Sequence, residues 1–162
     1  MALPQKLIDE FNVLVTHYPE RQAALIPALH RCQEDLGGWI SPQIMEDVAA
    51  YFELEPVEVF GVVTFYPMFR TTPRGKHLVS VCHNISCTLR GAEELLAKVC
   101  EVTGAKVHGT SPDGQFTVER VECQGACANA PMFDLDGVYH EDLDAAKAEQ
   151  ILRSALSSKV KA

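Results

Sequence analysis

Four of the six cysteines form two close pairs, and these pairs are the residues of the chain best suited to chemistry. Cys82 and Cys87 are separated by four residues, and Cys123 and Cys127 by three. Each spacing is short enough for both thiolates to bind one inorganic centre. The 35 residues between the pairs can form a small folding unit that brings them together. The two pairs therefore predict a metal site with four thiolate ligands.

The spacing also bears on which metal would bind. Thiolates select zinc, copper(I) or an iron–sulfur cluster. Structural zinc sites most often use C-x2-C knuckles and frequently include histidine, whereas four cysteines suit both [2Fe-2S] and [4Fe-4S] clusters. Two separated pairs favour the two-iron cluster, because each pair can hold one iron. The pattern thus favours [2Fe-2S], with structural zinc and a redox disulfide open as alternatives.

The other candidate residues are not expected to act at this site. Cys32 and Cys100 lie on the apolar stripes of predicted helices, where a free cysteine packs as a small hydrophobic residue. His83 lies between two ligand cysteines but is expected to be a surface loop residue, because four thiolates complete the coordination. No nucleophile elbow, P-loop or GxGxxG motif is present, so we expect neither a catalytic residue nor a nucleotide or flavin site in this chain.

Composition excludes several classes of function. The 162 residues carry a formal charge of −8 and no basic run, which argues against a nucleic-acid-binding protein. No apolar run approaches the length of a membrane span. The N-terminal residues lack the features of a secretory signal or a mitochondrial presequence. We therefore expect a cytoplasmic protein, and in a reducing compartment paired cysteines favour a metal over a disulfide.

The hydrophobic pattern divides the chain near Pro73 and Gly75. Before this point the period is helical, and Ser41-Pro42 and Glu55-Pro56 mark two helix starts. The predicted helices span about residues 7–15, 25–36, 42–52 and 56–64. The aromatic residues that follow, Phe65, Tyr66 and Phe69, are predicted to be exposed anchors for a partner. The alternative is that they seal the joint between the two domains. The first 73 residues are thus predicted to be a helical bundle that serves docking.

After Gly75, predicted strands alternate with predicted helices. Strands over residues 77–81 and 116–121 each lead directly into a cysteine pair. A helix from about Arg90 is expected to direct its positive end toward the metal. Asp136-Gly137 predicts the turn of a hairpin. A weak strand over residues 106–108 and a closing helix over residues 143–156 complete a compact α/β domain.

Several stretches resemble a known family, the E-type thioredoxin-like [2Fe-2S] subunit of respiratory complex I, NADH:quinone oxidoreductase. The similar stretches are residues 29–42, 59–66, 82–92 and 123–131, and they include both cysteine pairs with their spacing. Gln124 departs from the pattern, because the family commonly has leucine there. This difference bears on the reduction potential of a cluster more than on its binding.

The resemblance implies a two-part α+β chain, with a helical bundle over residues 1–73 and a thioredoxin-like domain over residues 74–158. The domain would hold one [2Fe-2S] cluster on Cys82, Cys87, Cys123 and Cys127. The cluster would exchange single electrons with the FMN of a partner flavoprotein subunit that also binds NADH. The chain would thus be part of an NADH dehydrogenase (quinone) complex without being catalytic alone.

The resemblance also implies where the protein is located, and it leaves other functions of the chain open. Other peripheral-arm subunits would be further partners, and neither nucleic acid binding nor direct membrane insertion is expected. The chain would lie on the cytoplasmic side of a bacterial inner membrane through its complex. An equivalent subunit of an NAD-dependent formate dehydrogenase or an NAD-linked hydrogenase is an alternative, and a zinc-stabilised scaffold module is another.

Overall fold

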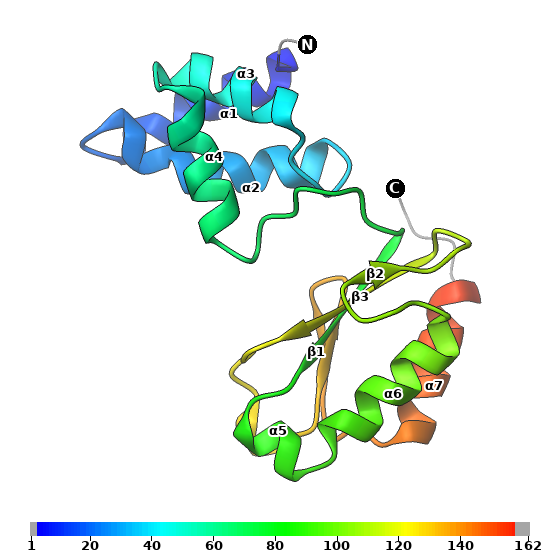
Figure 1. The fold of residues 1–162 in the computed structure, drawn as a ribbon. Helices are drawn as coiled ribbons and strands as arrows, with labels where there is room; N and C mark the ends of the chain where they lie inside the picture. The colour runs from blue at the N-terminus through cyan, green and yellow to red at the C-terminus, as the bar shows by residue number, and fades with distance from the viewer. Residues whose placement is uncertain (1–2, 158–162) are drawn as a thin grey trace. The chain divides into compact units, whose positions relative to one another are not determined.

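The chain forms two compact units, residues 1–73 and residues 74–162, in a computed structural model that describes residues 3–157 (Figure 1). Over residues 3–73 the first unit contains four α-helices and two short 3-10 helices. Its elements are α1 (Gln5–Leu14), η1 (Val15–His17), η2 (Arg21–Ala24), α2 (Leu25–Asp35), α3 (Pro42–Phe52) and α4 (Pro56–Phe65). The predicted helical N-terminal half is confirmed.

The predicted helix starts in this unit are observed. The side chain of Ser41 accepts a hydrogen bond from the backbone N–H of Ile44 at 3.2 Å and caps α3, with Pro42 as its first residue. Glu55 and Glu58 form a capping box at the start of α4, in which the Glu58 carboxylate accepts the N–H of Glu55 at 3.0 Å. Such caps satisfy N–H groups that a helix leaves free at its first turn.

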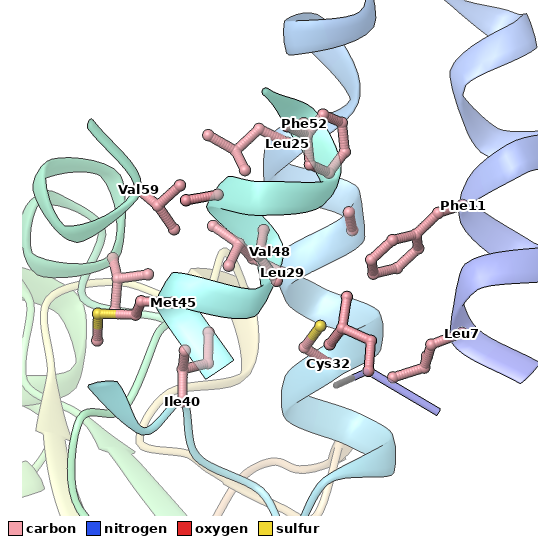
Figure 2. Packing of buried hydrophobic residues seen from close by; sticks show 14 of the residues in the cluster. Leu7, Phe11, Leu25, Leu29, Cys32, Ile40, Met45, Val48, Phe52 and Val59 are labelled. Atoms are coloured by element: carbon pink, nitrogen blue, oxygen red, sulfur yellow. The ribbon is translucent and has the colours of Figure 1, made fainter. Parts of the chain in front are cut away.

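The apolar stripes of the four helices meet in one core (Figure 2). Phe11 of α1, Leu29 of α2 and Val48 of α3 are completely buried. Cys32 lies in the same core, as the helical pattern predicted. Full burial of a side chain such as Leu or Phe stabilises a fold by about 1.5–3 kcal/mol. This core makes the helical unit compact without any residue of the cysteine pairs.

The segment after α4 differs in part from the prediction. Phe69 is buried in the helical core and its ring packs at a tilt against His30, with 4.8 Å between ring centroids, so the expectation that it is an exposed anchor is wrong. The amide of Gln33 holds this segment, donating to the carbonyl of Met68 at 3.0 Å and accepting the N–H of Arg70 at 2.8 Å. Phe65 is exposed, in agreement with the prediction.

The second unit is a five-stranded mixed sheet with helices. In chain order its elements are β1 (His77–Cys82), α5 (Ile85–Leu89), α6 (Ala92–Thr103), β2 (Gly109–Thr110), β3 (Phe116–Val121), η3 (Cys127–Asn129), β4 (Phe133–Leu135), β5 (Val138–His140) and α7 (Ala145–Ser157). The strand order is β2-β3-β1-β4-β5, with β1 and β3 parallel and the other pairs antiparallel. The predicted α/β domain is confirmed.

Helices α6 and α7 pack beside each other against the sheet (Figure 1). Val79, Val118 and Phe133 from three neighbouring strands are completely buried beneath them. The predicted strand over residues 106–108 is wrong, because only Val107 makes an isolated bridge and the short strand lies at Gly109–Thr110. Within residues 3–157, no helix is both long enough and apolar enough to cross a lipid bilayer.

Gly75 is expected to be essential for the second unit. A Cβ atom at this position would lie 2.8 Å from the backbone carbon of Phe116 and 3.1 Å from that of Gln115. Its N–H also donates to the hydroxyl of Thr117 at 2.6 Å. Since backbone atoms cannot move aside as a flexible side chain can, we expect Gly75→Ala to destabilise the second unit by about 2–3 kcal/mol. Urea unfolding followed by far-ultraviolet circular dichroism measures this loss.

Two controls accompany the Gly75 experiment. Gly61→Ala adds the same atom in open space within α4 and is expected to leave stability equal or higher. Trp39 is the single tryptophan and lies in the helical unit, so its fluorescence reports that unit separately. Equal unfolding midpoints for Gly75→Ala and the unchanged chain would show that the backbone contact is not restrictive.

Candidate metal centre

The parallel pairing of β1 and β3 brings the two cysteine loops to one edge of the sheet. The two strands are in register, with Cys82 opposite Val121 at their carboxyl ends. The N–H of His83 donates to the carbonyl of Val121 at 3.1 Å, which continues this pairing into the first loop. Cys123 follows Val121 by two residues. The pairing of β1 with β3 therefore brings together two cysteine pairs that are 35 residues apart in the sequence.

A short helix positions the first cysteine pair. The side chain of Asn84 accepts the N–H of Ile85 at 2.8 Å and starts α5, which carries Cys87. The hydroxyl of Thr88 donates to the carbonyl of His83 at 2.7 Å and closes the loop. Cys82 and Cys87 are both buried. The loop thus turns both thiols of the pair away from solvent.

The two thiols of this pair lie close to each other. Burial raises the pKa of the Cys87 thiol, and its hydrogen bond with Cys82 raises it further. The backbone N–H of Met132 donates to the Cys87 sulfur and acts in the opposite direction. Because a bound metal requires thiolates, binding at this pair must release protons. The Met132 N–H is positioned to stabilise the thiolate.

The second pair has a more open environment. Cys123 and Cys127 are exposed, and Cys127 begins the 3-10 helix η3. Gly125 has a φ of 80°, a conformation that glycine adopts at little cost. In this conformation its N–H points to the Cys123 sulfur, at 3.4 Å. The glycine conformation therefore brings a backbone N–H close to the sulfur of a predicted ligand.

Contacts also link the two loops. The Cys82 thiol donates to the carbonyl of Glu122 at 3.8 Å, beside Cys123. Cys127 is near enough to Cys87 to raise the pKa of that thiol through charge repulsion, a smaller effect than burial. A small apolar cluster lies beneath the pairs and consists of Cys82, Cys87, Ala92, Ala130 and Met132. All four predicted ligands therefore lie in two contacting loops.

The thiols of the two loops are the type of ligand that a two-iron cluster requires. Within residues 3–157, no three His, Cys, Asp or Glu side chains converge in a way that could hold a single ion. A [2Fe-2S] cluster requires only two thiolates for each iron, and the chain provides two pairs of free thiols. The assignment of Cys82, Cys87, Cys123 and Cys127 as ligands remains a prediction.

The structure adds one α-helix to those predicted. The helix expected from about Arg90 is α6, which begins at Ala92. The helix whose first turn lies in the ligand loop is α5, which was not predicted from the sequence. Asn84 was the available signal, because asparagine before an apolar residue is a common N-cap. With only five residues, α5 serves to position Cys87.

The neighbours of the ligand cysteines are polar. His83 is half-buried, and its Nε2 lies 3.5 Å from a carboxylate oxygen of Glu122. Gln124, between the second pair, buries its side-chain oxygen without a hydrogen-bond partner among the described residues. Met132, whose N–H reaches Cys87, was not predicted, since nothing in the sequence marks a backbone donor 45 residues away.

The remaining two cysteines belong to helices outside the two loops. Cys32 is in the core of the helical unit, where burial, followed by repulsion from Asp35 and Asp47, raises the pKa of its thiol to about 12. Cys100 on α6 is half-buried against the core of the second unit, and burial raises its pKa too. The helices that carry Cys32 and Cys100, α2 and α6, contain none of the four predicted ligands.

Alkylation should separate these classes of thiol. In the metal-free chain at pH 8, iodoacetamide is expected to label Cys123 and Cys127 first, because both are exposed. Cys32 should stay unlabelled until unfolding, since a pKa of about 12 against the usual 9.0 lowers its thiolate fraction about a thousandfold. Mass spectrometry of tryptic peptides gives the order of labelling. Early labelling of Cys32 would contradict its burial in the helical core.

Comparisons with known proteins agree with this geometry. The sequence profile of the thioredoxin-like [2Fe-2S] ferredoxin family matches residues 11–156. The chain is 38% identical over 146 residues to an E-type NADH-quinone oxidoreductase subunit of Rhizobium meliloti, covering 90% of this chain and 86% of that protein. It is 39% identical over 140 residues to NADH-quinone oxidoreductase subunit 2 of Thermus thermophilus, covering 86% of this chain and 77% of that protein.

A solved structure shares the fold. The NAD+-reducing [NiFe]-hydrogenase in its air-oxidized state has a TM-score of 0.71 to this chain at 22% identity. The likeness covers 82% of this chain but 23% of that hydrogenase chain, so this chain spans about a quarter of its length. Together, the matches confirm the resemblance and the fold class that the sequence predicted.

Proposed function

Since the chain belongs to the thioredoxin-like [2Fe-2S] ferredoxin family, we propose that it is the electron-transfer subunit of an NADH:quinone oxidoreductase. The observation that carries the proposal is the parallel register of β1 and β3, which places both cysteine pairs at one edge of the sheet. The sequence relatives favour this host over a hydrogenase or formate dehydrogenase, because the hydrogenase likeness is one of fold alone.

Cys82, Cys87, Cys123 and Cys127 would hold one [2Fe-2S] cluster. When bound, such a cluster accepts and releases one electron at a time. Cys82 and Cys87 are buried and would exclude water from one side of the site. The N–H groups of Met132 and Gly125 point at thiol sulfurs and would stabilise their negative charge. Four thiolates leave no open coordination position for substrate.

The exposed side of the site suggests how electrons would enter and leave. Cys123 and Cys127 are exposed, and so are Ile85 and Leu89 of α5, the helix that carries Cys87. A flavoprotein subunit that binds NADH and FMN is the proposed partner at the complex's peripheral arm. In this proposal the chain reaches the cytoplasmic face of a membrane only through its complex, and residues 1–73 serve docking.

Metal and sulfide analysis tests the proposed cofactor. The purified chain is expected to be red-brown and to contain about two irons and two acid-labile sulfides per chain. After reduction with dithionite it should give the EPR signal of a single unpaired electron. A colourless protein with one zinc and no sulfide would instead support the scaffold alternative.

The isolated chain is not expected to be an enzyme. Because it has no recognisable flavin or nucleotide motif, the purified chain should neither bind FMN nor oxidise NADH. Activity with ferricyanide as the acceptor should appear only after the flavoprotein partner is added. NADH oxidation by the flavin-free chain at rates near those of the reconstituted pair would contradict the proposed division of labour.

A further inference from the structure

One face of α4 is apolar although it lies at the surface of the helical unit. Val57, Phe60 and Phe65 expose 71%, 53% and 75% of their surface. On the opposite side, Val59 and Val63 are buried in the core. A helix that is apolar on both sides is normally covered on both sides. The outer face of α4 consists of Val57, Phe60, Gly61, Thr64 and Phe65 and continues to Met68 in the turn that follows.

The described side chains of this face offer no free hydrogen-bonding group. The hydroxyl of Thr64 donates to the carbonyls of Phe60 at 2.8 Å and Gly61 at 3.3 Å, within its own helix. The helix backbone is likewise paired internally. A partner must therefore bring an element whose backbone groups are already paired, and a helix meets this requirement by itself, whereas an unpaired strand or a loop does not.

Gly61 lies in the middle of the outer face, and its own unit does not require a glycine there. A Cβ atom at Gly61 would meet nothing within 4 Å, and the φ angle of Gly61 does not lie in the left-handed region. A glycine inside a helix costs about 1 kcal/mol relative to alanine. The presence of glycine at this position is explained if the backbone of a partner packs closely against α4 here.

The charge around the face indicates what kind of partner fits. Glu53, Glu55 and Glu58 lie at the N-terminal end of α4, and α4 itself contains no basic residue. The whole unit has four Lys or Arg and ten Asp or Glu, a formal charge of −6. A second copy of the chain would bring the same negative charge against it. Complementarity therefore requires basic residues beside the apolar stripe of the partner.

We infer that the outer face of α4 is the docking site for an apolar, basic-flanked helix of the flavoprotein partner, packed closely at Gly61. This inference rests on the proposed function for the identity of the partner. It specifies which surface of residues 1–73 makes the contact. Phe65 belongs to that surface, whereas the buried Phe69 does not.

Gly61→Leu is the direct test in the full-length chain. A Cβ atom at this exposed position meets nothing within 4 Å and leucine has a higher helix propensity than glycine, so the thermal unfolding midpoint should stay equal or rise. The affinity for the purified flavoprotein subunit, measured by calorimetry, should fall at least about tenfold, because the close approach is blocked. Ala50→Leu, at an exposed position of α3, makes a similar change away from the outer face and should not alter the affinity.

The possible results separate this inference from the proposed function. The cluster's visible and EPR spectra should be the same in all three chains, and a wild-type chain without a cluster would refute the function itself. If Gly61→Leu binds the flavoprotein as tightly as wild type while the cluster is intact, the docking inference is wrong. A wild-type dimer in sedimentation that Gly61→Leu dissociates would also overturn it, because the occupant would then be a second copy.

Discussion

The chain with Cys87→Ser is expected to lose its visible absorption and its EPR signal in the reduced state. Cys87 is buried beside Cys82, and it accepts the N–H of Met132. A serine hydroxyl is a much poorer ligand for iron than a thiolate, so the cluster should fail to assemble or should decay during purification. The same loss is expected for Cys82→Ser, Cys123→Ser and Cys127→Ser. Iron and sulfide contents, measured with the spectra, give the size of the effect.

Cys32→Ala and Cys100→Ala are the matched controls for the ligand set. Both remove a thiol outside the two loops, and both chains should keep the full spectrum. Cys32→Ala should also reduce the free energy of unfolding by about 1–2 kcal/mol, because it leaves a small cavity in the helical core. If Cys100→Ala loses the signal while a variant of the four predicted ligands keeps it, the assignment is wrong.

A chain that starts at Arg74 is expected to hold the cluster but no longer to bind the flavoprotein subunit. Residues 74–162 form a compact unit with its own core and include all four predicted ligands. The outer face of α4 is absent from this shortened chain, so co-purification with the partner should drop below detection. The visible spectrum confirms that the remaining unit is folded and loaded.

The single substitution is the control for this truncation. Gly61→Leu keeps every residue of the helical unit in place, so its weaker binding would locate the contact on α4. If the shortened chain bound the flavoprotein as tightly as the full chain, docking would have to be assigned to the thioredoxin-like unit instead. The exposed Ile85 and Leu89 of α5, on either side of Cys87 in sequence, would then be the first positions to substitute.

The local sequence was sufficient to predict most helices and strands. Ser41-Pro42 and Glu55-Pro56 mark the starts of α3 and α4 because capping depends on neighbouring residues alone. Asp136-Gly137 marks the hairpin between β4 and β5 for the same reason. The apolar periods predicted the core stripes of α1 and α2. The spacing of the cysteines predicted a thiolate site, since each pair lies within one loop.

Other features depended on contacts between distant segments. Phe69 lies in an aromatic run that reads as exposed, but Gln33 fixes this segment from 35 residues away and buries the ring. The short helix α5, which carries Cys87 inward beside Cys82, was not predicted, whereas the helix expected from about Arg90 is observed as α6. No local pattern contains this information.

The sequence by itself determined the type of most elements and the four thiols of the two pairs, because propensity, capping and ligand spacing are local properties. The tertiary structure decided that β1 and β3 are parallel neighbours in register, and so that both pairs share one edge. It also decided which side of α4 is buried, since Val59 and Phe60 are equally apolar in sequence. The physical reason is that strand pairing and helix packing join residues far apart in the chain, and their free energy depends on the whole arrangement.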